Sequence, residues 1–344
     1  MKARQFGCFN SGSLHRVFTV SVTFAVCAAL TLLPGAGLVH SAASLPSIKI
    51  GAAGPYSGDL SKIGLDGLNA IKMAVEEANA AGGVRGRKIE IVEADDAGDS
   101  SKAILVAEKL AMDRAVLGVV GPMNSSTVEA ALPTYQRAGL AIISQSATKP
   151  SLTEAGYKVM HRICPRDDAQ GPASAKFIVE VLKAKNVYII DDKTAYGQGL
   201  SDEVEAALKA AGVKPVRSQI TLEDRDFSPI LTRVRAAKPD LLYLGLANPA
   251  QAASIIKQAA GLGISVRFMG GDGLKEKDQL IAGSAGLAEG MYVTTIGRDI
   301  TEVPEAAEFI RKFEGKFGAM SVFSGQTYEA TNILIDAMRR ASTD

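Results

Sequence analysis

The sequence is poor in the side chains on which most catalytic and metal-binding sites depend. It has three cysteines and three histidines, and beyond residue 43 only Cys164 and His161 remain. A single cysteine permits no internal disulfide, and one histidine with one cysteine cannot form a Cys/His metal site. Cys164 is therefore expected to be a small buried residue, and His161, within a predicted strand, a structural histidine.

Nucleotide-binding and catalytic motifs are also missing. No GxGxxG motif follows a predicted strand and no GxxxxGK[ST] motif occurs, so neither a dinucleotide nor a triphosphate site is supported. A Ser-His-Asp triad could be built only through His161. Adjacent acids at strand ends or in loops are Asp95 and Asp96, Asp167 and Asp168, and Asp191 and Asp192. Such carboxylates usually cap helices or shape turns. We expect no enzyme activity, no cofactor and no metal.

The first 43 residues differ from the rest of the chain. Lys2, Arg4 and Arg16 are their only formal charges, an apolar run of about 17 residues follows at 17–33, and small residues end the segment at Ala43. This pattern predicts a secretory signal peptide cleaved near Ala43, with a periplasmic product. A membrane anchor is the alternative, but the run is at the lower limit for spanning a bilayer. Loss of three positive charges changes the formal net charge from +1 to −2, so nucleic acid is not an expected partner.

Strands and helices alternate through the remaining chain. Strands are predicted at 48–53, 89–94, 115–120, 140–143, 157–163, 186–190, 213–220, 240–244, 266–269 and 290–296. Helices are predicted from about Asp66, around 103–110, at 173–183, 200–211, 227–237, 250–262, 304–316 and 327–340. Two prolines, a glycine and two acids at 164–172 interrupt the pattern and predict a crossover between lobes. The alternation, present twice, predicts an α/β fold with two parallel sheets.

Two polar loops follow neighbouring predicted strands. Asn124, Ser125, Ser126 and Thr127 come after the strand at 115–120, and small donors at 144–148 come after the next strand. A helix beginning at the first loop offers free N–H groups and the positive end of its dipole to an anion. If the strands are adjacent and parallel, the loops form one pocket at their carboxyl ends.

Short motifs in order along nearly the whole chain beyond residue 47 resemble those of a known family. They are IKIGAAGPYSG at 48–58, NAAGGVRGRKIEIVEADDAGD at 79–99, GPMNSSTVEAA at 121–131, SATKPSLT at 146–153, DDAQGPASAKF at 167–177, DDKTAYGQG at 191–199 and FMGGDGL at 268–274. The chain resembles the type I periplasmic solute-binding proteins of ABC transporters, in particular the leucine/isoleucine/valine-binding group. The resemblance implies two Rossmann-like lobes, joined by a hinge, that close on an amino acid and deliver it to membrane permease subunits.

The resemblance also implies roles for individual residues. The family's carboxylate-binding positions fall on Ser125 and Thr148, with backbone contacts from Ser146 and Ala147 beside Thr148. Its ammonium-binding acid falls on Asp272 and a ligand-facing tyrosine on Tyr196. A monomer is expected, with a signal peptide at 1–43, an N-terminal lobe of 44–163 and 294–344, and a C-terminal lobe of 164–293.

Departures from the family pattern leave the ligand open. Ile63 and Ala247 occupy positions that are aromatic in leucine-binding relatives, and aspartate at 272 replaces the usual glutamate. Gly98 and Asn124 stand where relatives form a disulfide, and Phe323 is a candidate for an apolar wall. A binding protein or sensor for amides, urea or short carboxylates is the second hypothesis, and an exported enzyme the third. Relatives continue some tens of residues beyond this sequence, so final return strands are expected to lie outside it.

Overall fold

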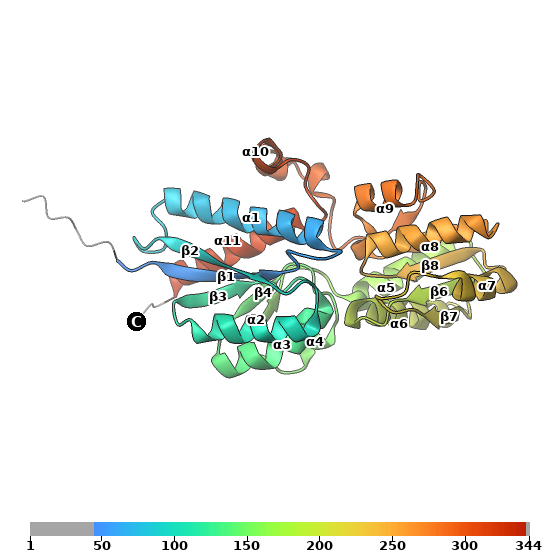
Figure 1. Ribbon diagram of the computed structural model, residues 1–344, viewed down its shortest axis with the longest axis horizontal. Coiled ribbons are helices and arrows are strands. Elements are labelled where there is room, and N and C mark those ends of the chain that lie inside the picture. The colour runs from blue at the N-terminus through green and yellow to red at the C-terminus, as the bar shows by residue number, and fades with distance from the viewer. Residues whose placement is uncertain (1–44, 342–344) are drawn as a thin grey trace, which may run out of the picture. The chain divides into compact units, whose positions relative to one another are not determined.

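The computed structural model describes residues 45–341, which form two parallel five-stranded sheets covered by helices (Figure 1). The predicted signal peptide lies outside the described residues. The first sheet has the order β2-β1-β3-β4-β5 and every neighbouring pair is parallel. Its strands are β1 (Ile48–Gly54), β2 (Ile89–Asp95), β3 (Val116–Val120), β4 (Ile142–Ser144) and β5 (Met160–Arg162). We call this sheet and the helices that cover it the first lobe.

Helices cover both faces of the first sheet. On one face α1 (Ser61–Ala80) packs beside α11 (Ser324–Arg340), although the two are far apart in the sequence (Figure 1). On the other face α2 (Ser100–Met112) packs beside α3 (Ser125–Ala138). Two separate clusters of buried apolar side chains lie beneath these helix pairs. Burial on both sides explains why the strands are nearly continuous apolar runs.

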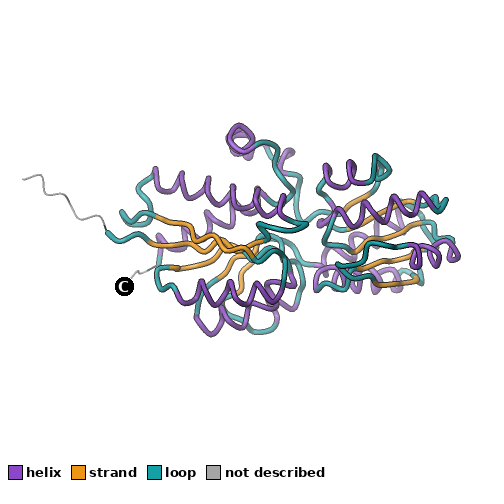
Figure 2. The backbone as a smooth tube through the Cα atoms, in the orientation of Figure 1, coloured by secondary structure: helices purple, strands orange, loops and turns teal. Residues whose placement is uncertain are grey.

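The second sheet has the order β10-β9-β8-β6-β7, again with every neighbouring pair parallel (Figure 2). Its strands are β6 (Val187–Asp191), β7 (Val216–Gln219), β8 (Leu241–Gly245), β9 (Arg267–Gly270) and β10 (Tyr292–Val293). Its helices are α5 (Asp167–Lys176), α6 (Ala195–Ala210), α7 (Ser228–Ala237), α8 (Pro249–Gly261) and α9 (Lys277–Gly283). We call this sheet and its helices the second lobe. The predicted α/β fold with two parallel sheets is confirmed.

The chain passes from β5 of the first sheet to α5 of the second lobe at the start of the predicted crossover at 164–172, but α5 begins at Asp167 and not at 173. The residue before it, Arg166, is extended, and Asp167 and Asp168 occupy the first helical turn. Acidic side chains there complement the positive end of the helix dipole, so the same acids that suggested a loop favour a helix start. Pro172 lies inside the helix, and a π-helical turn, Phe177–Val181, follows it.

Other helix starts and strand lengths also differ from prediction. α1 begins at Ser61 and not at Asp66, and α6 begins at Ala195 and not at 200. The start of α6 is set by Thr194, whose Oγ1 accepts a hydrogen bond from Gly197 N at 2.9 Å. The strand predicted at 290–296 is reduced to the two residues of β10. Two short helices, α4 (Ser151–Glu154) and α9, were not predicted, since neither has a long periodic pattern.

The aromatic side chains Phe309, Phe313 and Phe317, spaced four residues apart, belong to or pack against a cluster of buried apolar residues. They lie on α10 (Ala307–Phe317), where Phe313 is fully buried and Phe309 packs on Tyr328 with ring centroids 4.6 Å apart.

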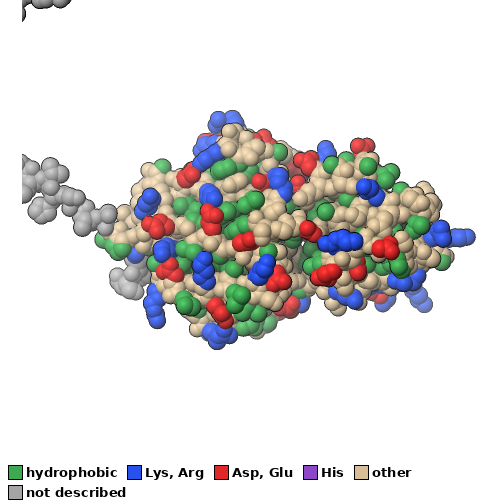
Figure 3. Space-filling model, in the orientation of Figure 1, with side chains coloured by type: hydrophobic (Ala, Val, Ile, Leu, Met, Phe, Trp, Pro, Cys, Tyr) green, Lys and Arg blue, Asp and Glu red, His purple; other side chains and the backbone are tan. Residues whose placement is uncertain are grey.

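Within residues 45–341, no helix combines the length and apolar composition that a membrane crossing requires. The face drawn in Figure 3 carries acidic and basic side chains intermixed over the described residues.

We expect Gly171→Ala to destabilise the protein by about 1–3 kcal/mol, because α5 and α6 approach too closely to admit a methyl group there. A Cβ at Gly171 would lie 2.4 Å from Glu203 Cβ and 2.9 Å from the Glu203 carbonyl carbon. Thermal unfolding monitored by circular dichroism measures the effect.

The matched control is Gly261→Ala at the end of α8, where a Cβ would meet no atom within 4 Å. Alanine there is expected to be neutral or to stabilise by up to about 1 kcal/mol. Equal effects of the two substitutions would contradict the close-approach explanation.

Candidate functional site

The loops after β3 and β4 are joined by side-chain hydrogen bonds. Ser144 Oγ donates to the Pro122 carbonyl at 2.7 Å, and Ser146 Oγ donates to the Met123 carbonyl at 2.9 Å. The parallel pairing of β3 with β4 places both loops at the same edge of the sheet. The prediction that these loops lie side by side is confirmed.

The small residues of these loops are buried. Ser125, at the first position of α3, is 1% exposed, and its Oγ accepts a hydrogen bond from Lys149 N at 3.3 Å. Ala147 and Thr148 are fully buried. Ala147 N donates to Ser144 Oγ at 3.2 Å, whereas Thr148 Oγ1 has no hydrogen-bond partner within the described residues. The Thr148 hydroxyl lies beside the buried carboxylate of Asp167 and acts to lower the pKa of that carboxyl.

A tyrosine and an aspartate are paired in the second lobe. Tyr196 lies in the first turn of α6, and Asp272 begins the 3-10 turn Asp272–Leu274 after β9. The Tyr196 hydroxyl donates to Asp272 Oδ1 at 2.8 Å and accepts from Gly273 N at 3.1 Å. Burial raises the pKa of Asp272 to about 6, while the Tyr196 hydrogen bond acts in the opposite direction. The carboxylate is thus held in place by a group that also favours its charged form.

One small cavity brings residues of both lobes together. Its volume is ≈ 30 Å³, enough for about two water molecules. Four predicted site residues line it: Ser125, Ser146, Tyr196 and Asp272. The two departures from the family pattern, Ile63 and Ala247, also line it, as does Phe323, the candidate for an apolar wall. The two other predicted site residues, Ala147 and Thr148, are not part of this lining.

A second and much larger cavity of ≈ 760 Å³ adjoins the small one. The two cavities share the four lining residues Leu60, Asn124, Tyr196 and Ala247. The rest of its lining comes from polar loops of both lobes, including Asp59 and Asp99 from the first and Lys193 and Glu223 from the second. The site therefore has a small inner part and a wide polar outer part.

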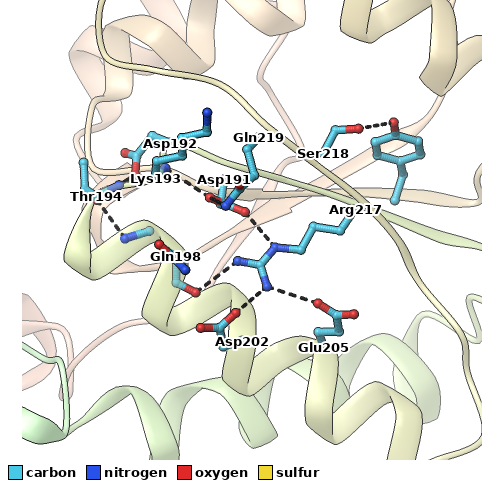
Figure 4. Close-up of polar contacts among 12 residues, drawn as sticks. Asp191, Asp192, Lys193, Thr194, Gln198, Asp202, Glu205, Arg217, Ser218 and Gln219 are labelled. Carbon is cyan, nitrogen blue, oxygen red and sulfur yellow. Dashed lines mark hydrogen bonds and ion pairs between the residues drawn. The ribbon is translucent and has the colours of Figure 1, made fainter.

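Two adjacent acids fix the segment that carries Tyr196. Asp192 Oδ1 accepts from Thr194 N at 3.0 Å and from Thr194 Oγ1 at 2.6 Å, and its Oδ2 accepts from Ala247 N at 2.7 Å. Asp191 Oδ1 accepts from Lys193 N at 3.0 Å (Figure 4). These bonds agree with the expectation that paired acids at strand ends shape turns. They tie the start of α6 to the end of β8.

Arg217 on β7 also holds the start of α6, through contacts with Asp191 and with residues of α6 (Figure 4). Its Nε donates to Asp191 Oδ2 at 2.7 Å, and its Nη atoms bind Asp202, Glu205 at 3.1 Å and the Gln198 carbonyl at 3.2 Å. Asp191 is fully buried, and this guanidinium is its counter-charge. The network fastens β6, β7 and the first half of α6 to one another.

Contacts between the lobes involve residues that the sequence did not single out. Ala195 N, at the start of α6, donates to Ser126 Oγ at 3.0 Å. Asn248 Nδ2 donates to Asp59 Oδ2 at 3.0 Å. Asp59 follows β1 and Asn248 follows β8, so each contact joins the carboxyl edge of one sheet to that of the other. The sequence placed Ser126 in a polar loop, but only the fold shows which residue faces it.

Other buried polar groups lie near the connection between lobes. Asp167 is fully buried, both of its carboxylate oxygens lack a partner within residues 45–341, and burial raises its pKa to about 7. Cys164 is buried as predicted, and burial raises the pKa of its thiol to about 12. His161 lies on β5 with its side chain exposed and not enclosed in the core.

These features define a two-lobed α/β protein with a candidate ligand site at the carboxyl edges of its two sheets. The sequence matches the periplasmic binding protein family over residues 47–344, and the chain belongs to this family. An "Amino acid binding protein" of Pseudomonas aeruginosa is 37% identical over 273 residues, which are 78% of this chain and 72% of that protein. A "Leucine-, isoleucine-, valine-, threonine-, and alanine-binding protein" of the same organism is 33% identical over 89% of this chain and 82% of its own.

Solved structures show the same fold. The leucine-binding protein LivK of Thermotoga maritima has a TM-score of 0.79 at 28% identity, covering 85% of this chain and 83% of that chain. LivJ of Streptococcus pneumoniae, solved in complex with isoleucine, also has a TM-score of 0.79 at 28% identity, covering 86% and 85%. The predicted resemblance to leucine/isoleucine/valine-binding proteins is confirmed.

We expect Arg217→Ala to destabilise the protein by about 3–5 kcal/mol, because it leaves the carboxylate of Asp191 buried without a counter-charge. Urea unfolding of the purified protein measures the change. The control is Lys209→Ala, which removes an exposed ion pair to Glu205 and is expected to cost less than about 1 kcal/mol. A loss no larger for Arg217→Ala than for Lys209→Ala would show that the network does not stabilise the second lobe.

We expect Asp272→Asn to raise the melting temperature of the ligand-free protein at pH 7. The folded-state pKa of about 6 lies above the ordinary value of 3.8, so the folded protein loses stability as the pH rises from about 3.8 to 6. Asparagine removes this cost, which is about 1–3 kcal/mol above pH 6.

Thermal melts of both proteins from pH 4 to pH 8 test this expectation, with Asp278→Asn on the exposed side of α9 as the control. The increase in melting temperature caused by Asp272→Asn should become smaller below pH 6. An advantage that is equal at pH 4 and pH 8 would mean that ionisation of Asp272 is not its cause.

Proposed function

We propose that this protein is an extracytoplasmic solute-binding protein that captures an amino acid between its two lobes. The observation that carries the proposal is the lining of the small cavity, where Ser125 and Ser146 face Asp272 and Tyr196. The start of α3 offers hydroxyl and N–H groups suited to a carboxylate. Asp272 offers a fixed negative charge suited to an ammonium group. A zwitterion satisfies both sides at once.

The proposed site includes Ala147 and Thr148 as the floor beneath the first-lobe loops. In this proposal Ala147 and Thr148 contact the ligand only if the loop moves, because both are fully buried and the Ala147 N–H and carbonyl are already bonded to Ser144 and Arg162. Tyr196 positions Asp272 through its hydroxyl. Binding would stabilise the closed arrangement because the carboxylate contacts one lobe and the ammonium contacts the other.

The relatives support the ligand class and the transport role. Their printed names describe binding of amino acids, among them leucine, isoleucine, valine, threonine and alanine. We propose that this chain likewise delivers an amino acid to the permease subunits of an ABC transporter, as a monomer in the periplasm after cleavage near Ala43, without catalysis. We further propose lobe boundaries of 44–163 with 294–344, and 164–293, since α11 packs on α1 of the first lobe.

Isothermal titration calorimetry with a panel of amino acids, amides and short carboxylates tests the proposal. We expect an amino acid to bind, and Asp272→Ala to weaken it by about 10- to 150-fold, equivalent to about 1.5–3 kcal/mol for a charge-assisted hydrogen bond. Affinity should also fall as the pH drops below about 6, where Asp272 takes up a proton.

Asp278→Ala is the matched control, because this acid is exposed on α9 and lines neither cavity. Unchanged amino-acid affinity in Asp272→Ala would contradict the proposal that Asp272 binds the ammonium group of the ligand. Preferential binding of amides or of acids without an amino group would favour the second hypothesis, and turnover of any ligand would favour an enzyme.

A further inference from the structure

The two cavities meet at one small side chain. Leu60, Asn124, Tyr196 and Ala247 line both cavities, and the alanine is the smallest of the four. Ala247 follows β8, and its backbone N–H is held by Asp192 Oδ2 at 2.7 Å. The position of its methyl group is therefore fixed by the network that supports α6. A larger side chain here would narrow the junction between the cavities.

The inner cavity is too small for a whole amino acid of any length. A volume of ≈ 30 Å³ holds about two water molecules, and the apolar side chains around it are closely packed. Ile63 is 3% exposed and Met123 is 4% exposed, and both pack in one buried apolar cluster with Phe323. A branched aliphatic side chain placed inward would have to displace one of them. The remaining direction for a ligand side chain is outward, past Ala247.

The outer cavity is wide and carries charged side chains from both lobes. Its ≈ 760 Å³ is lined mainly by polar loop residues, several of them exposed. Its charged side chains are the acids Asp59, Asp99, Asp192 and Glu223 and the bases Lys102 and Lys193. An aliphatic group placed among them stays in contact with water and gains little from burial. The excess of acids favours a cationic group over an anionic one.

We propose that the preferred ligand is an α-amino acid with a long, polar-ended side chain, and that Ala247 determines this preference by keeping the two cavities connected. The inference rests on the proposed function, since it places the α-amino and carboxylate groups between Ser125 and Asp272, where the inner cavity adjoins the outer one. The side chain passes Ala247 and ends in the polar outer cavity. Cationic and amide ends are accepted better than a carboxylate end.

Calorimetry of the purified full chain with alanine, leucine, glutamine, arginine and glutamate tests the inference. The expected affinities are highest for arginine and glutamine and lower for leucine and glutamate. Ala247→Phe should weaken the binding of arginine and glutamine by about tenfold or more relative to any loss it causes for alanine. Ala247→Ser, which keeps a small side chain, should retain the original order. Thermal melts of each variant show that it is folded.

A second variant tests the electrostatic part. Glu223→Lys, in an exposed loop of the outer cavity, should reduce the preference for arginine over glutamate without affecting alanine. Tighter binding of leucine than of both arginine and glutamine would overturn the inference while leaving the proposed function intact. Equal loss of alanine and arginine in Ala247→Phe would also overturn it. If no amino acid binds, the proposed function fails together with the inference.

Discussion

The hydrogen bond from Tyr196 to Asp272 is the interaction on which the site depends. A buried carboxylate is costly, and it is retained here because a hydroxyl from another element holds it in one orientation. That hydroxyl is itself positioned by the start of α6, which Thr194 and Asp192 fix. The ion network around Arg217 then anchors α6 to the second sheet. A chain of polar contacts thus runs from Arg217 on β7, through the start of α6, to Asp272 at the cavity.

Much of this fold could be predicted from the sequence, because its signals are local. Apolar strands that alternate along the chain with periodic helices such as α1 predicted both parallel sheets. The loops after β3 and β4 could be placed together because parallel strands bring their carboxyl ends to one edge. Helix boundaries were less predictable where a residue type common in loops also begins a helix. The acids at the start of α5 and the threonine before α6 look like loop residues until their hydrogen bonds are known.

The candidate site was predictable only in part, for a different reason. Family motifs pointed to Ser125, Ser146, Tyr196 and Asp272, and the structure places all four around one cavity. Pairings across the cleft, such as Asp59 with Asn248, join residues 189 positions apart in the sequence. No periodicity or spacing encodes such a pairing, because it depends on how the lobes meet. The depth of Thr148 and the exposure of His161 likewise depend on neighbours distant in sequence.

The bond between Ala195 N and Ser126 Oγ has an electrostatic consequence. It joins the first turns of α6 and α3, so the amino-terminal ends of two helices face each other across the cleft. Both ends carry a partial positive charge, and in an empty cleft they repel each other. An anion between them is attracted by both and removes this repulsion. A single anion bound between the two positive helix ends therefore holds the lobes together.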